Sequence, residues 1–171
     1  MRILLGWMLG AFCMTLAPAS AQTANPPFIV MISAEAPAAN IGPDSYTVKA
    51  GSDVFIKVRL TNTSLQDLSI GVDSDSRTEV NFYHHYEVRD GSGNSAKKRA
   101  ITHPEIGSTG HGWPDRIVKP GETLEIASDR ISRLYDLTQP GKYTIQLTRA
   151  VSGAPRNGEV SSKIITLAVT E

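Results

Sequence analysis

Four histidines are the residues of this sequence best suited to acid–base chemistry or metal binding: His84, His85, His103 and His111. Imidazole titrates near neutral pH and is the commonest metal ligand in proteins. His84 and His85 are neighbours in a stretch with the alternation of a β-strand, so their side chains face opposite sides of it. A site that joins His85 to the two later histidines needs a long loop to fold back, and nothing in the spacing requires that. We therefore predict no metal site and no cofactor.

Nucleophilic catalysis is the second chemistry to consider. Ser108, His111 and Asp115 contain the residue types of a hydrolase triad, but they merely share a loop, and a triad depends on geometry and an oxyanion hole. No Gly-x-Ser-x-Gly motif is present. The acidic stretch 73–79 lacks the ligand spacing of a calcium-binding loop. We expect the protein not to be an enzyme.

The most suggestive surface is the glycine-rich stretch 107–114, in which Trp113 lies close to His111. Tryptophan is enriched at binding hot spots, and loops on a rigid scaffold often carry recognition. We therefore select His111, Trp113 and Asp115 as candidate partner-contact residues. The alternative is that Trp113 folds inward as a lid over the edge of a sheet.

The N-terminal residues predict export. Arg2 precedes an apolar stretch at 3–16, and the small residues 19–21 form a cleavage site typical of a signal peptide. The only cysteine, Cys13, lies in this leader, so the mature chain has no thiol. We predict a signal peptide at 1–21, a flexible linker at 22–27 and one domain at 28–171, in a secreted or periplasmic protein.

Charge and hydropathy exclude two classes of partner. The 17 lysine and arginine residues balance 17 aspartate and glutamate residues, whereas a nucleic-acid binder shows a basic face. No later stretch approaches the roughly 20 apolar residues of a membrane-spanning helix. A domain of this size can bury enough surface to fold without disulfides. The expected partner is a protein or a cell-envelope component.

Alternation of apolar and polar residues predicts the strands that carry these side chains. The clearest run is 54–60, and similar patterns occupy 68–72, 82–89, 123–126, 142–148 and 164–169. A continuous apolar run at 28–32 brings the total to about seven strands. The stretch 34–43 is rich in alanine, proline and glycine and predicts an irregular loop.

Turn residues predict how the strands connect. Two Pro-Gly pairs, at 120–121 and 140–141, reverse the chain, and Tyr143 follows where the hydroxyl of a tyrosine corner bonds to upstream backbone. Between them, apolar residues at 131, 134 and 137 predict a helical turn capped by Ser128 or Asp129. We predict an all-β, immunoglobulin-like Greek-key sandwich with one short helical turn.

Asn62, Thr63 and Ser64 spell an N-glycosylation acceptor. Polar turn formers at the end of a strand account for the same three residues. We favour the turn.

Several stretches together resemble secreted bacterial immunoglobulin-like domains: Lys49 to Ser52, Asn62 to Ser64, Val88 to Asp90, Val118 to Glu122, Leu134 to Leu137 and Pro140 to Tyr143. Similar stretches occur in the β-sandwich pro-domain of deuterolysin-type metallopeptidases and, more loosely, in proteinase-inhibitor-like sandwiches. The resemblance implies the fold over most of the mature chain. It does not carry peptidase activity, since the sequence has no His-Glu-x-x-His motif.

Three functions remain open from the sequence. The first is an exported, non-catalytic binding or accessory module. The second is a proteinase inhibitor that inserts a loop such as 107–114 into a protease. The third is a small metal-binding protein or enzyme that uses the histidines.

Overall fold

The computed structural model describes residues 26–35, 37–72, 74–75, 79–81, 83–100, 115–150 and 159–171. The predicted signal peptide at 1–21 and most of the predicted linker at 22–27 lie outside these residues. Within the described ranges, no helix has the length and apolar character needed to cross a bilayer.

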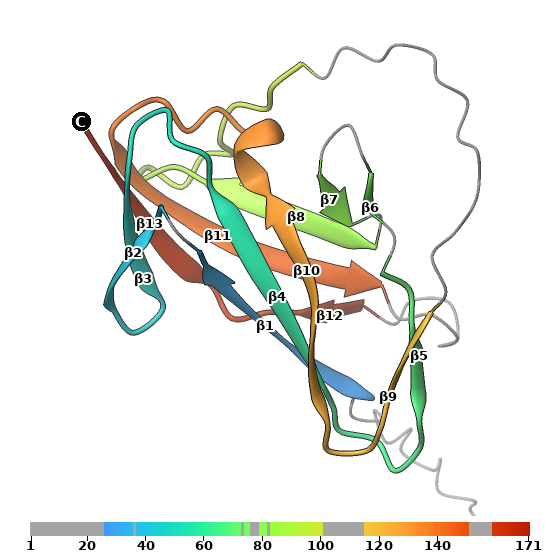
Figure 1. Ribbon diagram of the computed structural model, residues 1–171. Helices are drawn as coiled ribbons and strands as arrows, with labels where there is room; N and C mark the ends of the chain where they lie inside the picture. Colours follow the sequence, from blue (N-terminus) through green and yellow to red (C-terminus); the bar gives the residue numbers. More distant parts are fainter. Residues whose placement is uncertain are drawn as a thin grey trace, which may run out of the picture.

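Two larger sheets pack face to face (Figure 1). The first has the antiparallel order β1-β4-β10 and comprises β1 (Phe28–Ala34), β4 (Phe55–Asn62) and β10 (Thr123–Arg130). The second has the order β8-β11-β13-β3-β2 and comprises β8 (His84–Arg89), β11 (Gly141–Ala150), β13 (Ile165–Thr170), β3 (Ser45–Lys49) and β2 (Ala39–Gly42). In this sheet β12 (Glu159–Ser161) pairs with the end of β11, and β13 runs parallel to β3.

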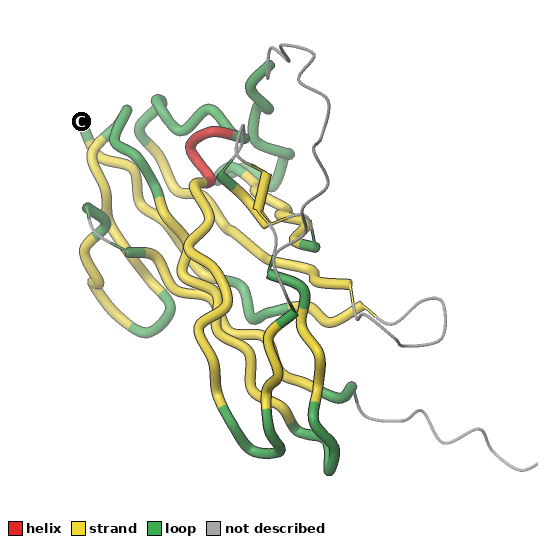
Figure 2. The backbone as a smooth tube through the Cα atoms, turned by 45° about the vertical axis from the view of Figure 1, so that its right-hand side comes forward, coloured by secondary structure: helices red, strands yellow, loops and turns green. Residues whose placement is uncertain are grey.

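Smaller elements complete the described fold. Two short sheets pair β5 (Leu68–Ile70) with β9 (Arg116–Val118), and β6 (Ser74–Asp75) with β7 (Val80–Asn81). A 3₁₀ turn, η1 (Ile131–Arg133), follows β10 directly. Figure 2 shows that strands make up most of the described chain, with η1 as the helical segment.

One hydrophobic core lies between the two larger sheets. Val58 from β4 faces the same interior as Ile145 from β11 and Leu167 from β13, and all three are fully buried. Leu124 from β10 packs against this cluster while partly buried. Each fully buried aliphatic side chain contributes roughly 1.5–3 kcal/mol. The predicted all-β sandwich is confirmed, and its immunoglobulin-like connectivity stays a prediction.

The first Pro-Gly turn forms as predicted, whereas Gly141 of the second pair is already the first residue of β11. Gly121 has a φ of 77°, and the amide of Glu122 donates to the carbonyl of Lys119 at 3.0 Å, which closes the first turn. After the second, the hydroxyl of Tyr143 donates to the carbonyl of Gln139 at 3.0 Å. The hydrogen bond predicted for a tyrosine corner is therefore present.

Strands β2 and β3 differ from the sequence prediction, which gives an irregular loop at 34–43 and no strand at 45–49. β3 presents only Tyr46 and Val48 to the core, a pattern too short to identify a strand. Its parallel partner, β13, begins at Ile165. A pairing over such a separation leaves no local pattern in the sequence.

The helical turn is confirmed as η1, but the predicted cap is wrong. Arg130 occupies the N-cap position and makes no side-chain capping bond. Ser128 donates instead to the carboxylate of Glu35. Asp129 is buried in the interior, where it accepts hydrogen bonds described below.

Asn62 is a structural residue and not a glycosylation site. Its side-chain amide is fully buried and donates to the carbonyls of Gln66 at 2.7 Å and Val118 at 2.8 Å. Its side-chain oxygen accepts from the amide of Ser64 at 2.8 Å. The turn interpretation is confirmed, because the nitrogen that a glycan would occupy is already bonded inside the protein.

We expect Asn62→Ala to lower the free energy of unfolding by about 1–3 kcal/mol, because it removes the donor to the buried carbonyl of Val118 and the acceptor of the Ser64 amide. Urea denaturation of the mature chain measures the change. Thr63→Ala is the matched control, since its hydroxyl makes one exposed bond to Pro26, and it should cost less than about 1 kcal/mol. Equal costs for the two variants would contradict the assignment.

Candidate functional site

The candidate partner-contact residues lie at the border of the described chain. His111 and Trp113 lie outside the described residues, together with the stretch 107–114 on which the inhibitor hypothesis depends. Asp115 is described and exposed, and it accepts a hydrogen bond of 2.6 Å from the hydroxyl of Ser69. Asp115 thus joins β5 to the start of β9, and its role in partner contact stays a prediction.

The histidines separate as the alternation predicts. His84 points into the interior and meets the ring of Tyr86 edge to face, with 6.2 Å between ring centroids, whereas His85 is exposed. His103 and Ser108, like His111, lie outside the described residues. Among the residues that are described, no three His, Cys, Asp or Glu side chains converge as metal ligands.

His84 belongs to a buried network of charged side chains that crosses between the two sheets. Its Nδ1 contacts the carboxylate of Asp129 on β10, and its Nε2 contacts the guanidinium of Arg149 on β11. Arg149 is only 1% exposed, and it also donates to the carbonyl of Gly71. Its Cζ lies 5.4 Å from the centroid of the Tyr83 ring, close enough for a cation–π contact.

Asp129 collects further donors. The hydroxyl of Tyr86 donates to Oδ2 at 2.6 Å, and the backbone amide of Asn81 donates to Oδ1 at 2.9 Å. Burial, the negative charge of Asp129 and the hydrogen bond to it raise the pKa of Tyr86 well above its usual range, so the hydroxyl keeps its proton. The Asp129 side chain thus accepts hydrogen bonds from three groups, on Asn81, His84 and Tyr86.

The contacts fix the protonation of His84. Arginine can only donate, so Nε2 accepts from Arg149 and Nδ1 carries the proton given to Asp129. Burial, assisted by the positive charge of Arg149, lowers the pKa of His84, which agrees with a neutral ring. Burial lowers the pKa of Arg149 to about 10, so it is still charged at neutral pH. The network runs from cation through neutral imidazole to anion.

This arrangement is closed to catalysis by His84. A catalytic Asp-His pair uses the free ring nitrogen to take a proton from a nucleophile. Here that nitrogen is occupied by Arg149, and the His84 side chain has no exposed surface. The network holds β8, β10 and β11 together and is not an active site.

Sequence reasoning missed the network, although part of the signal was available. The alternation of 142–148, continued by one residue, puts Arg149 on the buried face with Ile145 and Leu147. The sequence alternation did not place Asp129 on the buried face, because a bulge between Glu125 and Ala127 shifts the alternation of β10. Without the bulge, Ser128 would face inward and Asp129 outward.

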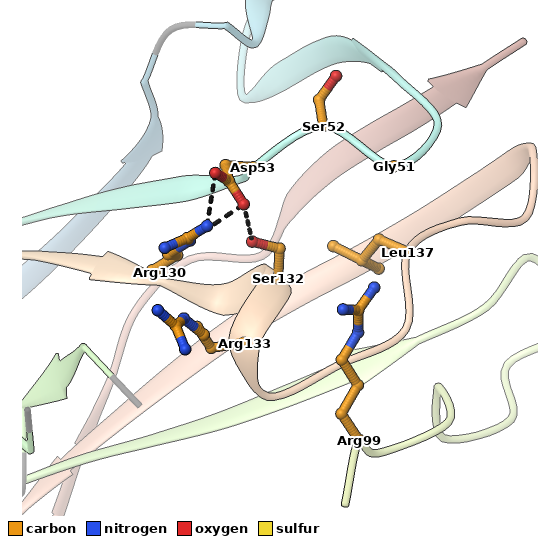
Figure 3. A pocket seen from close by; sticks show the side chains of 8 residues that line it. All are labelled: Gly51, Ser52, Asp53, Arg99, Arg130, Ser132, Arg133 and Leu137. Carbon is orange, nitrogen blue, oxygen red and sulfur yellow. Dashed lines mark hydrogen bonds and ion pairs between the residues drawn. The ribbon is translucent and has the colours of Figure 1, made fainter. Parts of the chain in front are cut away.

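A second site lies beside η1, where a cavity of about 270 Å³ opens at one end of the sandwich (Figure 3). Three segments meet there: the loop before β4, the end of β10 with η1 and the residues after it, and the segment that follows the hairpin at 90–94. The lining residues are Gly51, Ser52, Asp53, Arg99, Arg130, Ser132, Arg133 and Leu137. We call this cavity the arginine pocket.

Arg130 forms one wall of the arginine pocket, where two carboxylates hold its side chain in place. Its Nε donates to Oδ1 of Asp53 at 3.0 Å and its Nη2 lies 2.6 Å from Oδ2, while Nη1 donates to Glu79 at 3.1 Å. The guanidinium also lies over the ring of Phe55, 5.7 Å from its centroid. The bond from Arg130 lowers the pKa of Asp53, and the two carboxylates raise the pKa of Arg130.

The other two arginines are held less tightly. Arg133 is 48% exposed and donates to Glu79 at 3.3 Å, whereas Arg99 is 45% exposed and lies 3.7 Å from Asp136. Figure 3 shows Arg99 across the cavity from Asp53, with its guanidinium beside Leu137. The lining therefore carries three positive charges and one negative charge.

The arginine pocket presents positive charge and hydrogen-bond donors. Ser132 is the hydroxyl beside the Asp53 carboxylate, but it is buried, accepts from the amide of Val54 at 3.2 Å and lies 3.3 Å from Asp53. These bonds fix the loop before β4. Guanidinium groups stay protonated and act as donors to anions, not as general bases.

No protein-family model matches this sequence, and no curated protein matches it either. These comparisons do not identify a metallopeptidase pro-domain or an inhibitor-like family.

We expect Arg149→Met to lower the free energy of unfolding by about 3–5 kcal/mol, because it leaves the charge of Asp129 buried without its cation. Denaturant unfolding at pH 7 measures this change. Arg89→Met is the control on the exposed face of β8, and surface substitutions usually stay within about 0.5 kcal/mol. A cost for Arg149→Met as small as that of the control would refute the role of the network.

The lowered pKa of His84 predicts a pH dependence of stability. The unfolded chain binds a proton on this ring as the pH falls below about 6.5, while the native ring stays neutral. The free energy of unfolding should therefore rise with pH between the native pKa and 6.5, by up to about 1.4 kcal/mol per pH unit.

His84→Gln removes this titration, so its stability should depend less on pH than that of the wild type. Unfolding curves from pH 5 to pH 8 for both proteins provide the comparison. His85→Gln is the control, because His85 is exposed, and it should keep the wild-type slope. Parallel curves for the wild type and His84→Gln would show that the buried ring does not titrate as described.

Proposed function

We propose that this protein is an exported, non-catalytic β-sandwich module that binds a protein or envelope component at the arginine pocket. The observation that carries the proposal is the open cavity lined by three arginines, two of which keep about half of their side-chain surface exposed. Arginine is enriched at binding hot spots, where its planar group makes several hydrogen bonds.

The contrast with the buried network supports binding over catalysis. Arg149 is fully enclosed, and its bonds to His84 and Gly71 use its donors inside the protein. Arg99 and Arg133 instead face a cavity that connects with solvent. The same residue type is thus structural in the interior and available to a partner at the surface.

The scaffold supports recognition because the arginine pocket is assembled before any partner arrives. The amide of Ile131 donates to the carbonyl of Val54 at 2.9 Å, which ties η1 to the start of β4. The amide of Arg99 donates to the carbonyl of Leu134 at 2.9 Å, which ties the third segment to the same end. A preorganised site loses less conformational entropy on binding.

Export is supported by the N-terminal 21 residues, which have the charge, apolar stretch and small residues of a signal peptide. This N-terminal pattern favours a module that works in the periplasm or outside the cell.

The test is retention of an envelope component by the immobilised mature chain. The pocket variant Arg99→Gln/Arg133→Gln should reduce retention at least about tenfold at moderate salt, because it removes the two exposed guanidiniums. Quantitative mass spectrometry of the eluted material gives the readout, and thermal unfolding verifies that the variant is folded.

The matched control is Arg59→Gln/Arg116→Gln, which removes the same net charge from exposed positions outside the arginine pocket. It should retain as much material as the wild type. If the two double variants lose retention equally, binding reflects net charge and the arginine pocket is not the site.

A further inference from the structure

We infer that the arginine pocket receives a carboxylate from a protein partner, either an acidic side chain or a C-terminal carboxylate, and that Arg99 is the residue that contacts it. The inference rests on the proposed function, because it names the chemistry of the group that the same cavity binds. Four properties of the pocket carry it: donor geometry, charge, size and openness.

The hydrogen-bond donors of Arg99 have the geometry to bind a carboxylate. A guanidinium has five donors arranged as a fork that matches a carboxylate. Arg130 already uses three of its nitrogens on Asp53 and Glu79. Arg99 makes one long contact of 3.7 Å within the described part of the chain, so its fork can take a further carboxylate. Arg133 also lines the pocket and has one described contact, to Glu79 at 3.3 Å.

Charge favours a carboxylate over a phosphate. The lining has an excess of positive charge, but Asp53 stays within it as an anion because its bond to Arg130 lowers its pKa. Glu79 and Asp136 beside the lining also pair with its arginines, so three carboxylates offset the three guanidiniums. This balance leaves little net attraction for a phosphate dianion, whereas the fork of Arg99 matches a carboxylate with a single charge. The arrangement of Arg130 between Asp53 and Glu79 also shows that this surface accommodates carboxylates side by side.

Size limits the occupant to about one residue. The cavity of about 270 Å³ lies just below the roughly 300–1,000 Å³ of pockets that enclose drug-sized ligands. A single acidic side chain or a terminal residue fits, whereas a sugar chain or a large cofactor does not.

The exposure of the arginine pocket to solvent indicates that the carboxylate is part of a larger molecule. Ion pairs between exposed groups contribute only about 0–1 kcal/mol, and Arg99 is nearly half exposed. A free amino acid would therefore bind weakly. A protein that presents the carboxylate gains additional contacts on the surrounding surface, which excludes water from the ion pair and strengthens it.

The experiment is a titration of the ¹⁵N-labelled mature chain followed by NMR, with backbone amides and arginine Nε groups as probes. Four compounds are compared: N-acetylglutamate α-methylamide for a side-chain carboxylate, N-acetylalanine for a terminal carboxylate, N-acetylglutamine α-methylamide as the neutral control, and inorganic phosphate. At least one carboxylate should shift the signals of Gly51, Ser52 and Arg99 with a Kd in the millimolar range.

Arg99→Gln should weaken carboxylate binding about tenfold, the loss expected for a charge-assisted hydrogen bond. Arg59→Gln should leave it unchanged, since Arg59 lies outside the arginine pocket. Whichever carboxylate binds more tightly identifies the source, side chain or chain terminus. The neutral amide should produce no saturable shifts in the pocket.

Three results would overturn the inference: equal titration by acid and amide, carboxylate shifts that persist in Arg99→Gln, or saturation by phosphate at a lower concentration than by either carboxylate. These results leave the proposed function standing if envelope retention still depends on Arg99 and Arg133. Loss of that dependence would remove the proposed function itself, whatever the small probes bind.

Discussion

The fold depends on the requirement that a buried cation must have an anion opposite it. Arg149 is enclosed on β11, and an unpaired charge at that depth would be incompatible with a stable domain of ordinary size. The anion, Asp129, comes from β10 in the other sheet, with His84 between them. The network therefore requires the two sheets to face each other in one alignment. Hydrophobic packing alone would specify that alignment less strictly. The network acts as a noncovalent link between the two layers of the sandwich.

A single irregularity in β10 connects the interior with the surface. The bulge between Glu125 and Ala127 shifts the alternation, so that Asp129 points into the core and Arg130 points outward. Arg130 then bridges Asp53 and Glu79, and η1 begins at the next residue. The bulge thus sets both the buried network and the wall of the arginine pocket. Bulges are frequent beside functional sites because they redirect side chains in this way.

Period-two alternation was enough to predict the all-β sandwich, because Val58, Ile145 and Leu167 repeat within long strands whose inner face is buried. Turn chemistry predicted the reversal at Pro120 and Gly121 and the bond of Tyr143, since both depend on residues close in sequence. The arginine pocket was not predictable in this way. Arg99, Arg130 and Arg133 come from segments that only the tertiary fold brings together, and Asp129 was hidden by the bulge. Local patterns report which face a residue occupies, but not which distant residue it meets.

The parallel pairing of β3 with β13 has a consequence for how the molecule is made. β3 ends at Lys49, and its neighbour in the sheet is not synthesised until residues 165–170 emerge. Contacts so distant in sequence form slowly, because the entropy of closing the intervening loop must be overcome first. The larger sheet therefore stays incomplete until β13 has been synthesised and inserts between β3 and β11. Until then β3 lacks its parallel partner, so this sheet is completed late in folding.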